Sequence, residues 1–279
     1  MGKIWIALGI VGLAAGALGY ARKWSQVGLL NSVDALLSGR VAVRKAESGV
    51  AFGPLARQKL DIWVPTNKSA KPRDVVVFFY GGSWNSGDRE LYGFVGRALA
   101  ARGFVVVLPD YRLVPEVRFP RFVEDGAAAV AWTRANIARF GGNPERIHLS
   151  GHSAGAHIAA LLTLDTHWLR SAGAPANTIR SFAGLAGPYD FLPFTSDASK
   201  AAFGQMPDPK PSQPITFARK DAAPMLLLTG SADTTVKPRN SSALAKAQAK
   251  VGAVAQTIVF DGVGHSDIIM AVAQPFRSK

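Results

Sequence analysis

The sequence predicts an α/β protein with a mostly parallel central sheet and helices on both faces. Short apolar runs alternate with longer helix-like runs along most of the chain, an order typical of parallel strands joined by helices. The chain has 279 residues, of which 48% are hydrophobic, enough for one large domain with a buried core. The alternating runs span residues 75–80, 88–102, 104–109, 121–139, 147–151, 154–164, 181–186, 225–229, 241–251 and 257–260.

The chain begins with an uncharged run, Ile4 to Tyr20, which basic residues flank on both sides. As a helix this run would extend about 25 Å, slightly less than the ~30 Å hydrocarbon core of a bilayer. It predicts a single-pass N-terminal membrane anchor within residues 1–23, followed by the α/β domain over residues 24–279. A secretory signal cleaved after Ala17, with export of the domain, and a buried soluble helix are the alternatives. Basic residues after the run favour the cytoplasmic face, but the side of the membrane stays open.

The runs 41–52 and 59–64 precede the first helix-like run and predict an antiparallel start to the sheet. Residues 74–80 then read as a buried strand, and Gly81-Gly82-Ser83-Trp84 follows directly. A glycine pair after a strand presents backbone N–H groups that no strand partner uses. Alone this loop predicts an ordinary strand-to-helix turn, but beside a nucleophile the N–H groups of Gly82 and Ser83 would stabilise an oxyanion.

The most informative stretch is Gly151-His152-Ser153-Ala154-Gly155, which reads G-x-S-x-G between a strand-like run and a helix-like run. A serine on a sharp strand-to-helix turn projects its hydroxyl out of the fold, and flanking glycines let the backbone pack closely. The start of the next helix points N–H groups, including that of Ala154, toward an anion above the serine. The stretch predicts Ser153 as a catalytic nucleophile.

A serine nucleophile needs a base and an acid that orients the base. His265 lies in a glycine-rich loop beyond the strand-like run 257–260, where it is free to reach Ser153. Asp233 lies in the loop beyond the run 225–229, which gives the chain order Ser, Asp, His. The less favoured acids are Asp190, Asp221, Asp261 and Asp267. The other histidines are interpreted as structural or exposed: His148, His152, His157 and His167.

Together these motifs resemble the α/β-hydrolases, in the esterase/lipase branch related to hormone-sensitive lipase. The matching segments are Tyr80–Trp84 (H-G-G-x-W), Asp110–Pro120 (D-Y-R-L-x-P-E-x-x-F-P), Asp125–Trp132 (D-x-x-A-A-x-x-W), Gly141–Ile147 (G-G-[DN]-P-x-R-I) and the loops at Asp233 and His265. The resemblance covers roughly residues 45 to 275. It implies the α/β-hydrolase fold and hydrolysis of carboxylic esters with no metal and no organic cofactor.

Two positions depart from the pattern of that branch. Tyr80 stands where the H-G-G-x-W loop has histidine, and its hydroxyl is expected to brace the loop instead. After His265 only a short stretch follows, whereas the branch has a closing helix there. The last helix is therefore short, or the sequence is truncated.

The sequence says less about the substrate than about the fold or the catalytic residues. The proline-rich segment 191–217 interrupts the alternation and predicts either part of a cap over Ser153 or an ordinary long loop. An uncharged small-molecule ester is expected, with arylformamide hydrolysis of the kynurenine-formamidase type and a non-catalytic membrane-tethered binding role as alternatives. The candidate pocket walls are Trp84, Phe191 and Phe194, together with Phe203 and Met206.

The net charge of +13 comes from basic residues that are spread over the whole chain. No nucleic-acid motif accompanies them, so we expect no nucleic-acid partner. The basic N-terminal region is expected to be attracted to anionic lipid. The chain has no cysteine, which excludes disulfides and cysteine-based zinc sites, and the oligomeric state stays open.

Overall fold

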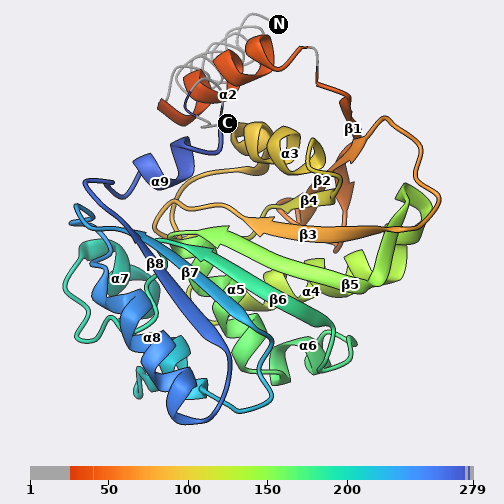
Figure 1. The fold of residues 1–279 in the computed structure, drawn as a ribbon. Coiled ribbons are helices and arrows are strands. Elements are labelled where there is room, and N and C mark those ends of the chain that lie inside the picture. The colour runs from red at the N-terminus through yellow and green to blue at the C-terminus, as the bar shows by residue number, and fades with distance from the viewer. Residues whose placement is uncertain (1–25, 40, 274–275, 277–279) are drawn as a thin grey trace, which may run out of the picture.

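The computed structural model describes residues 26–39, 41–273 and 276, which form one eight-stranded sheet with helices around it (Figure 1). The strand order is β1-β2-β4-β3-β5-β6-β7-β8. The strands are β1 Val43–Ala51, β2 Lys59–Pro65, β3 Arg73–Phe79, β4 Val105–Pro109, β5 Gly142–His152, β6 Ile179–Leu185, β7 Met225–Gly230 and β8 Ala255–Phe260. β1 pairs antiparallel with β2, and β2 with β4, whereas every other pair is parallel. The predicted α/β-hydrolase fold, with its antiparallel start, is confirmed.

Helices lie on both sides of the sheet, with α3 on one side and α4, α5 and α6 on the other (Figure 1). The α-helices are α2 Gln26–Leu37, α3 Gly93–Ala100, α4 Arg121–Asn136, α5 Ala154–Leu164, α6 His167–Ser171, α7 Asp197–Phe203, α8 Arg239–Lys250 and α9 Asp267–Met270. The 3-10 turns are η1 Arg89–Tyr92, η2 Ile137–Phe140, η3 Lys210–Ser212 and η4 Pro214–Phe217. These helices supply the crossovers that parallel strands require.

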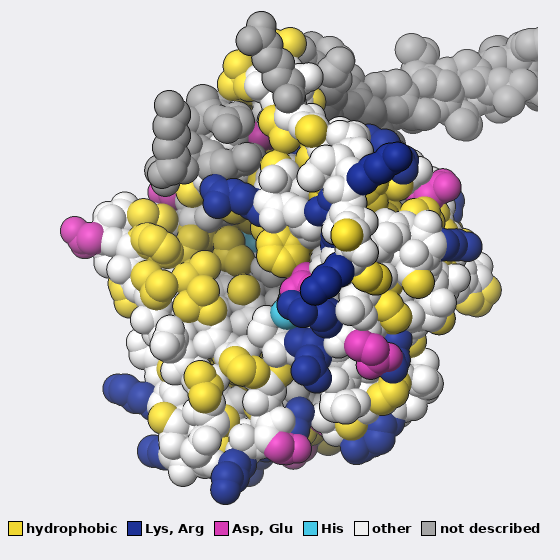
Figure 2. All heavy atoms as spheres, turned by 45° about the vertical axis from the view of Figure 1, so that its right-hand side comes forward, with side chains coloured by type: hydrophobic (Ala, Val, Ile, Leu, Met, Phe, Trp, Pro, Cys, Tyr) yellow, Lys and Arg dark blue, Asp and Glu magenta, His cyan; other side chains and the backbone are white. Residues whose placement is uncertain are grey.

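The central strands are buried on both faces, because helices cover both. In β3 every residue from Val75 to Phe79 is buried, and in β4 all five residues are. Such continuous apolar runs are typical of central parallel strands. β8 is one of the two edge strands, and its Ile258, Val259 and Phe260 are exposed. Figure 2 shows hydrophobic side chains gathered in one broad area of the surface, beside a band of Lys and Arg side chains.

The segment 191–217 between β6 and β7 is not an extended loop. It contains α7, η3 and η4, and the hydroxyl of Ser196 caps α7 by accepting a hydrogen bond from the Ser199 N–H. The single short helix α9 follows His265 in the described residues. α2, α6 and α7 were not predicted from the sequence.

The run Ile4 to Tyr20 lies outside the described residues. Within the part of the chain that the structure describes, no helix has the length and apolar character needed to cross a bilayer.

α3 lies directly on the sheet because Gly96 has no side chain. A Cβ atom at Gly96 would come within 2.6 Å of the Trp63 indole ring. We expect Gly96→Ala to lower the free energy of unfolding by about 1–3 kcal/mol, although alanine is favoured in helices by about 1 kcal/mol. Urea denaturation measures the change. Gly39→Ala is the matched control, since its Cβ would meet only the Leu36 carbonyl at 3.5 Å. A Gly96→Ala protein as stable as wild type would contradict this packing argument.

Candidate active site

Ser153 stands at the sharp turn between β5 and α5. Its backbone has φ +53° and ψ −122°, a conformation that residues with side chains rarely adopt. The flanking glycines make the turn possible: a Cβ atom at Gly151 would lie 2.6 Å from the Gly155 carbonyl, and a Cβ atom at Gly155 would overlap the Phe79 carbonyl. The structure therefore has the strand–turn–helix geometry that the G-x-S-x-G stretch predicts.

The structure brings Ser153, His265 and Asp233 into one hydrogen-bonded line. The Ser153 Oγ lies 2.9 Å from His265 Nε2, and His265 Nδ1 lies 2.8 Å from Asp233 Oδ2. The other Asp233 oxygen accepts hydrogen bonds from the backbone N–H groups of Thr235 and Val236, at 2.9 and 2.8 Å. Because the Asp233 carboxylate is held from both sides, Nδ1–H of His265 points to it and Nε2 is left to accept the serine proton.

The carboxyl ends of three parallel strands bring these side chains together. Ser153 follows β5, Asp233 follows β7, and His265 follows β8. The four less favoured aspartates lie elsewhere in the hydrogen-bond network, where Asp190 pairs with Arg239, Asp221 with Arg219, Asp261 with Ser231, and Asp267 with the Gly264 N–H.

The loop after β3 faces Ser153 and carries three residues with positive φ: Gly82 at +132°, Ser83 at +51° and Trp84 at +59°. A Cβ atom at Gly82 would overlap the Ser86 carbonyl, so this position requires glycine. Gly82, Ser83 and Ser153 line the same cavity. Within the described part of the chain, the N–H groups of Gly82, Ser83 and Ala154 make no hydrogen bond and are free to bind an oxyanion.

Tyr80 is the first residue after β3, and a buried hydrogen-bond network holds its side chain in place at the start of that loop. Its hydroxyl accepts from Arg57 at 2.9 Å and donates to Asp110 at 3.0 Å. Its ring stacks on Tyr111 at 4.7 Å, and the Tyr111 hydroxyl donates to the Tyr80 carbonyl at 2.9 Å. Burial, reinforced by the Asp110 carboxylate, raises the pKa of Tyr80 well above its usual range, so the hydroxyl stays protonated and remains a donor. These contacts are those expected of a brace.

Two buried neutral histidines connect the loops around Ser153, and the sequence assigned neither of them a place in the site. Burial lowers the pKa of His152 to about 3, with a contribution from His265, and burial lowers the pKa of His157 to about 4. His152 Nε2–H donates to the His265 carbonyl at 3.0 Å. His157 Nε2–H donates to the Ser212 carbonyl at 2.7 Å, and its Nδ1 accepts from Trp84 at 3.3 Å.

Two cavities meet at Ser153. The larger, about 210 Å³, is mostly apolar and extends under α2 and α9, with walls that include Leu30, Tyr92, Phe94, Ile269 and Met270. The smaller, about 140 Å³, lies against the segment 191–217, with walls that include Trp84, Phe191, Thr195, Ser196 and Ser199. None of the described residues that line either cavity is Lys, Arg, Asp or Glu.

Of the five candidate pocket residues, Trp84 and Phe191 line the smaller cavity, and their rings stack at 5.9 Å. Phe203 and Met206 line neither of the two cavities. Phe194 does not line either cavity and packs instead on Phe203 and Phe191, at 5.4 and 5.7 Å. The walls of the larger cavity were not predicted from the sequence.

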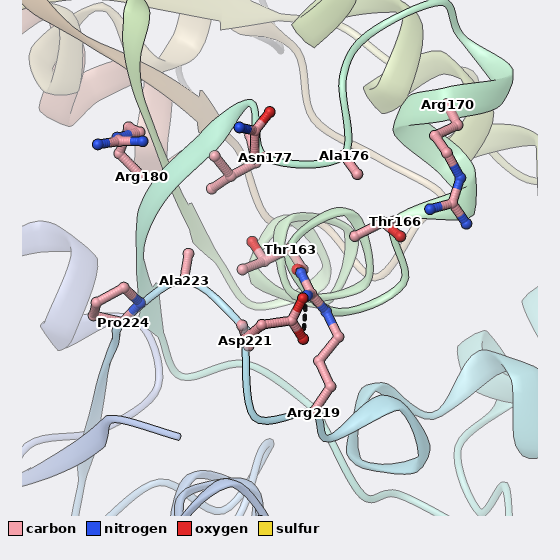
Figure 3. Close-up of a pocket in the computed structure, with 12 residues that line it drawn as sticks. Thr163, Thr166, Arg170, Ala176, Asn177, Arg180, Arg219, Asp221, Ala223 and Pro224 are labelled. Carbon is pink, nitrogen blue, oxygen red and sulfur yellow. Dashed lines mark hydrogen bonds and ion pairs between the residues drawn. The ribbon is translucent and has the colours of Figure 1, made fainter. Parts of the chain in front are cut away.

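A still larger cavity, about 470 Å³, lies at the opposite edge of the sheet, near the amino ends of β6 and β7 (Figure 3). Its arginines do not converge: Arg219 is paired with Asp221 at 2.8 Å, while Arg170 and Arg180 lie on opposite sides of it. Among residues 26–39, 41–273 and 276, no group of three or more His, Asp or Glu side chains has the geometry of a metal site.

The BD-FAE family model matches residues 60–248, which include Ser153 and Asp233. The chain is 32% identical over 244 residues to a probable isoprenylcysteine alpha-carbonyl methylesterase of Oryza sativa, covering 79% of this chain and 57% of that protein. It is 32% identical over 205 residues to the esterase LipC of Mycobacterium tuberculosis, covering 67% of this chain and 51% of that protein. The chain thus spans between half and three fifths of the length of these relatives.

Among solved structures, a truncated carbohydrate esterase from gut microbiota matches with a TM-score of 0.75 at 21% identity, covering 85% of this chain and 94% of that chain. The butyrate-bound esterase Est2 of Thermogutta terrifontis matches with a TM-score of 0.67 at 25% identity, covering 79% of this chain and 84% of that chain. Both likenesses agree with the fold described above.

The two buried histidines should make the protein unstable in mild acid. Their pKa values are about 3 and about 4 in the folded state, against about 6.5 in the unfolded chain. As the pH falls below about 6.5, the unfolded chain binds protons that the folded one does not, so stability is highest above that pH. Each histidine should lower the free energy of unfolding by up to ~1.4 kcal/mol per pH unit, down to about pH 4.

Urea denaturation at a series of pH values measures how the free energy of unfolding changes with pH. His157→Gln removes one of the two histidines, so it should reduce this slope by about half. A free energy of unfolding that does not change between about pH 6.5 and pH 4 would contradict the assignment of both histidines as buried and neutral.

Proposed function

The chain belongs to the BD-FAE family, and from that membership we propose that it is a serine hydrolase of carboxylic esters. The observation that carries the proposal is the hydrogen-bonded line from Ser153 through His265 to Asp233, beside two cavities whose described walls contain no Lys, Arg, Asp or Glu. The esterase names of the relatives support the same reaction class.

In the proposed reaction, the Ser153 Oγ attacks the ester carbonyl while His265 Nε2 takes its proton. Asp233 holds the Nδ1–H of His265 and stabilises the imidazolium that forms. The N–H groups of Gly82, Ser83 and Ala154 bind the oxyanion of the tetrahedral intermediate, an effect worth about 3–4 kcal/mol for one such donor. His265 then gives its proton to the departing alcohol, which leaves an acyl group on Ser153.

Water completes the cycle by the same steps in reverse order. His265 takes a proton from the water, which attacks the acyl carbonyl, and the proton passes to Ser153 as the carboxylic acid leaves. His152 supports this exchange because it is neutral and holds the His265 backbone by a hydrogen bond. A protonated, positively charged His152 would repel the imidazolium of His265 and disfavour its formation.

The cavities support an uncharged substrate with small or medium groups on both sides of the ester. Among the described residues, neither cavity offers a Lys, Arg, Asp or Glu side chain to pair with an ionised acyl or alcohol group. Arylformamide hydrolysis would need the same Ser153 and His265, and no feature of the site favours it. A purely non-catalytic binding role has no observation in its favour.

A second serine, histidine and aspartate lie in line on the sheet and provide a control. Ser181 Oγ is 2.8 Å from His148 Nδ1, and His148 Nε2 is 3.4 Å from Asp74 Oδ2. Ser181, however, lies within β6, paired with β5, and not at the start of a helix. It therefore has a histidine neighbour but no oxyanion donors, and His148 Nε2 makes no hydrogen bond to Asp74.

We expect Ser153→Ala to lower kcat/KM on p-nitrophenyl butyrate about a thousandfold or more, and Ser181→Ala to leave it unchanged. A fluorophosphonate probe, which reacts with activated serines, should label wild type and Ser181→Ala but not Ser153→Ala. Circular dichroism checks that each variant is folded. Probe labelling that persists in Ser153→Ala would overturn the proposed function, as would a wild-type protein that hydrolyses no ester. Rates on N-formylkynurenine measured beside those on the aryl ester test the amide alternative.

We also propose that residues 4–20, which lie outside the described part of the chain, hold the protein on a membrane. The support is in the sequence: an uncharged run with basic residues on both sides. Full-length protein should sediment with membranes and resist both carbonate and high salt, since screening at 1 M shortens electrostatic attraction to about 3 Å. Soluble protein that still begins at Met1 would contradict the anchor. A mature N-terminus near Leu18 would instead identify a cleaved signal.

A further inference from the structure

Helix α2 has apolar side chains on two sides, and among the described residues only one side packs against the rest of the domain. On the packed side Leu30 is buried, and the buried Asp34 carboxylate accepts a 2.6 Å hydrogen bond from Arg97 of α3. On the outer side, four apolar residues recur at the spacing of one helical stripe and are exposed: Leu29, Val33, Leu36 and Leu37. Leu36 is 82% exposed and Leu37 54%. We call these four residues the outer stripe.

Single exposed leucines are common, but a contiguous apolar stripe on one helix marks a contact surface. We propose that the outer stripe of α2 docks on the surface of an anionic lipid bilayer. The partner is inferred from the chain that leads into the helix and from its charge. Residues 1–25 lead directly into α2, which begins at Gln26, and they contain the uncharged run 4–20.

In the sequence around α2, basic residues outnumber acidic residues. The first 46 residues contain six basic residues, of which Lys45 pairs with the buried Asp61, but only one acidic residue, Asp34, which is buried against Arg97. α2 itself carries no basic residue, and the basic residues lie in the segments of sequence before and after it, where they would attract anionic lipid headgroups. The same charge opposes pairing of the outer stripe with a second copy, because two basic regions would be brought together.

α2 is fixed to the body of the domain, so docking would orient the whole molecule. Arg97 also donates to the Asn31 carbonyl at 2.9 Å, and its guanidinium lies over the Trp63 ring of β2 at 5.4 Å. Asn31 in turn donates to the Glu90 carbonyl at 2.9 Å. Contacts from α2 therefore reach η1, α3 and the sheet itself.

The same helix forms one wall of the larger cavity at Ser153, through Gln26, Val27 and Leu30. A helix with its side chains is about 10–12 Å across, so docking of the outer stripe places this cavity about one helix diameter from the lipid. This consequence rests on the proposed function. The proposed substrates are then uncharged esters that dissolve in the bilayer and reach Ser153 without passing through bulk water.

The absence of cysteine from the chain allows a direct test. Full-length protein with Leu36→Cys carries an environment-sensitive fluorophore and is mixed with phosphatidylcholine–phosphatidylserine vesicles, with and without nitroxide groups on the lipid acyl chains. Val254→Cys, which is 62% exposed beside β8, is the matched control. We expect nitroxide lipid to quench the label at position 36 and not the one at 254. No quenching at 36, or quenching at both positions, overturns the proposal. A blue shift at 36 without vesicles also overturns it, because protein then covers the stripe.

A second experiment measures the consequence for catalysis. The double variant Leu36→Gln/Leu37→Gln should hydrolyse an ester dissolved in the vesicles about fivefold more slowly, and should hydrolyse a water-soluble butyrate ester at the wild-type rate. Val251→Gln/Val254→Gln, which removes exposed apolar side chains elsewhere, should match wild type on both. Equal loss on both esters in the α2 variant overturns the docking role. If wild type hydrolyses neither ester, the proposed function fails, while the quenching experiment still decides the docking.

Discussion

At Ser153 the backbone takes a left-handed conformation, with φ of +53°, that costs about 1–3 kcal/mol in a residue with a side chain. Burial of α5 offsets this cost, because every residue from Ala154 to Leu164 is buried. Gly155 is the contact that makes the arrangement possible: without a side chain it lies against the carbonyls of Phe79 and Tyr80 at the end of β3. The turn at Ser153 and the start of the glycine loop after β3 are therefore in direct contact.

The glycine loop has its own constraint, since Ser83 and Trp84 also have positive φ. Two anchors hold it. At its start, the Tyr80 hydroxyl lies between Arg57 and Asp110. At its other end, the buried Trp84 indole packs edge-on against Phe203 at 4.8 Å and donates to His157. Tyrosine can thus replace histidine as the brace, because a buried hydroxyl that both donates and accepts satisfies the arginine and the aspartate at once.

The sequence allowed prediction of those features that depend on a local residue pattern or on the order of residues along the chain. The turn at Ser153 is specified by its own glycines, and Asp233 and His265 were identifiable because each follows a strand-like run and the order Ser, Asp, His is retained. The walls of the larger cavity could not be predicted, since Leu30, Phe94 and Ile269 come from three distant segments that only the folded chain brings together. For the same reason the sequence did not distinguish His157 from a core histidine, or Phe194 from Phe191 as a pocket wall, because ring packing in the segment 191–217 decides both.

The three groups of the candidate active site differ in how firmly the sheet holds the strands that carry them. Ser153 follows β5, which is paired on both sides, whereas His265 follows β8, an edge strand paired only with β7. Edge strands open by local fluctuation at a lower free energy than central ones, as amide hydrogen exchange detects. The His265 loop is therefore expected to open at a lower free energy than β3, β4 and β5. Heating should therefore open β8 and the His265 loop reversibly, at temperatures where circular dichroism still reports a folded protein.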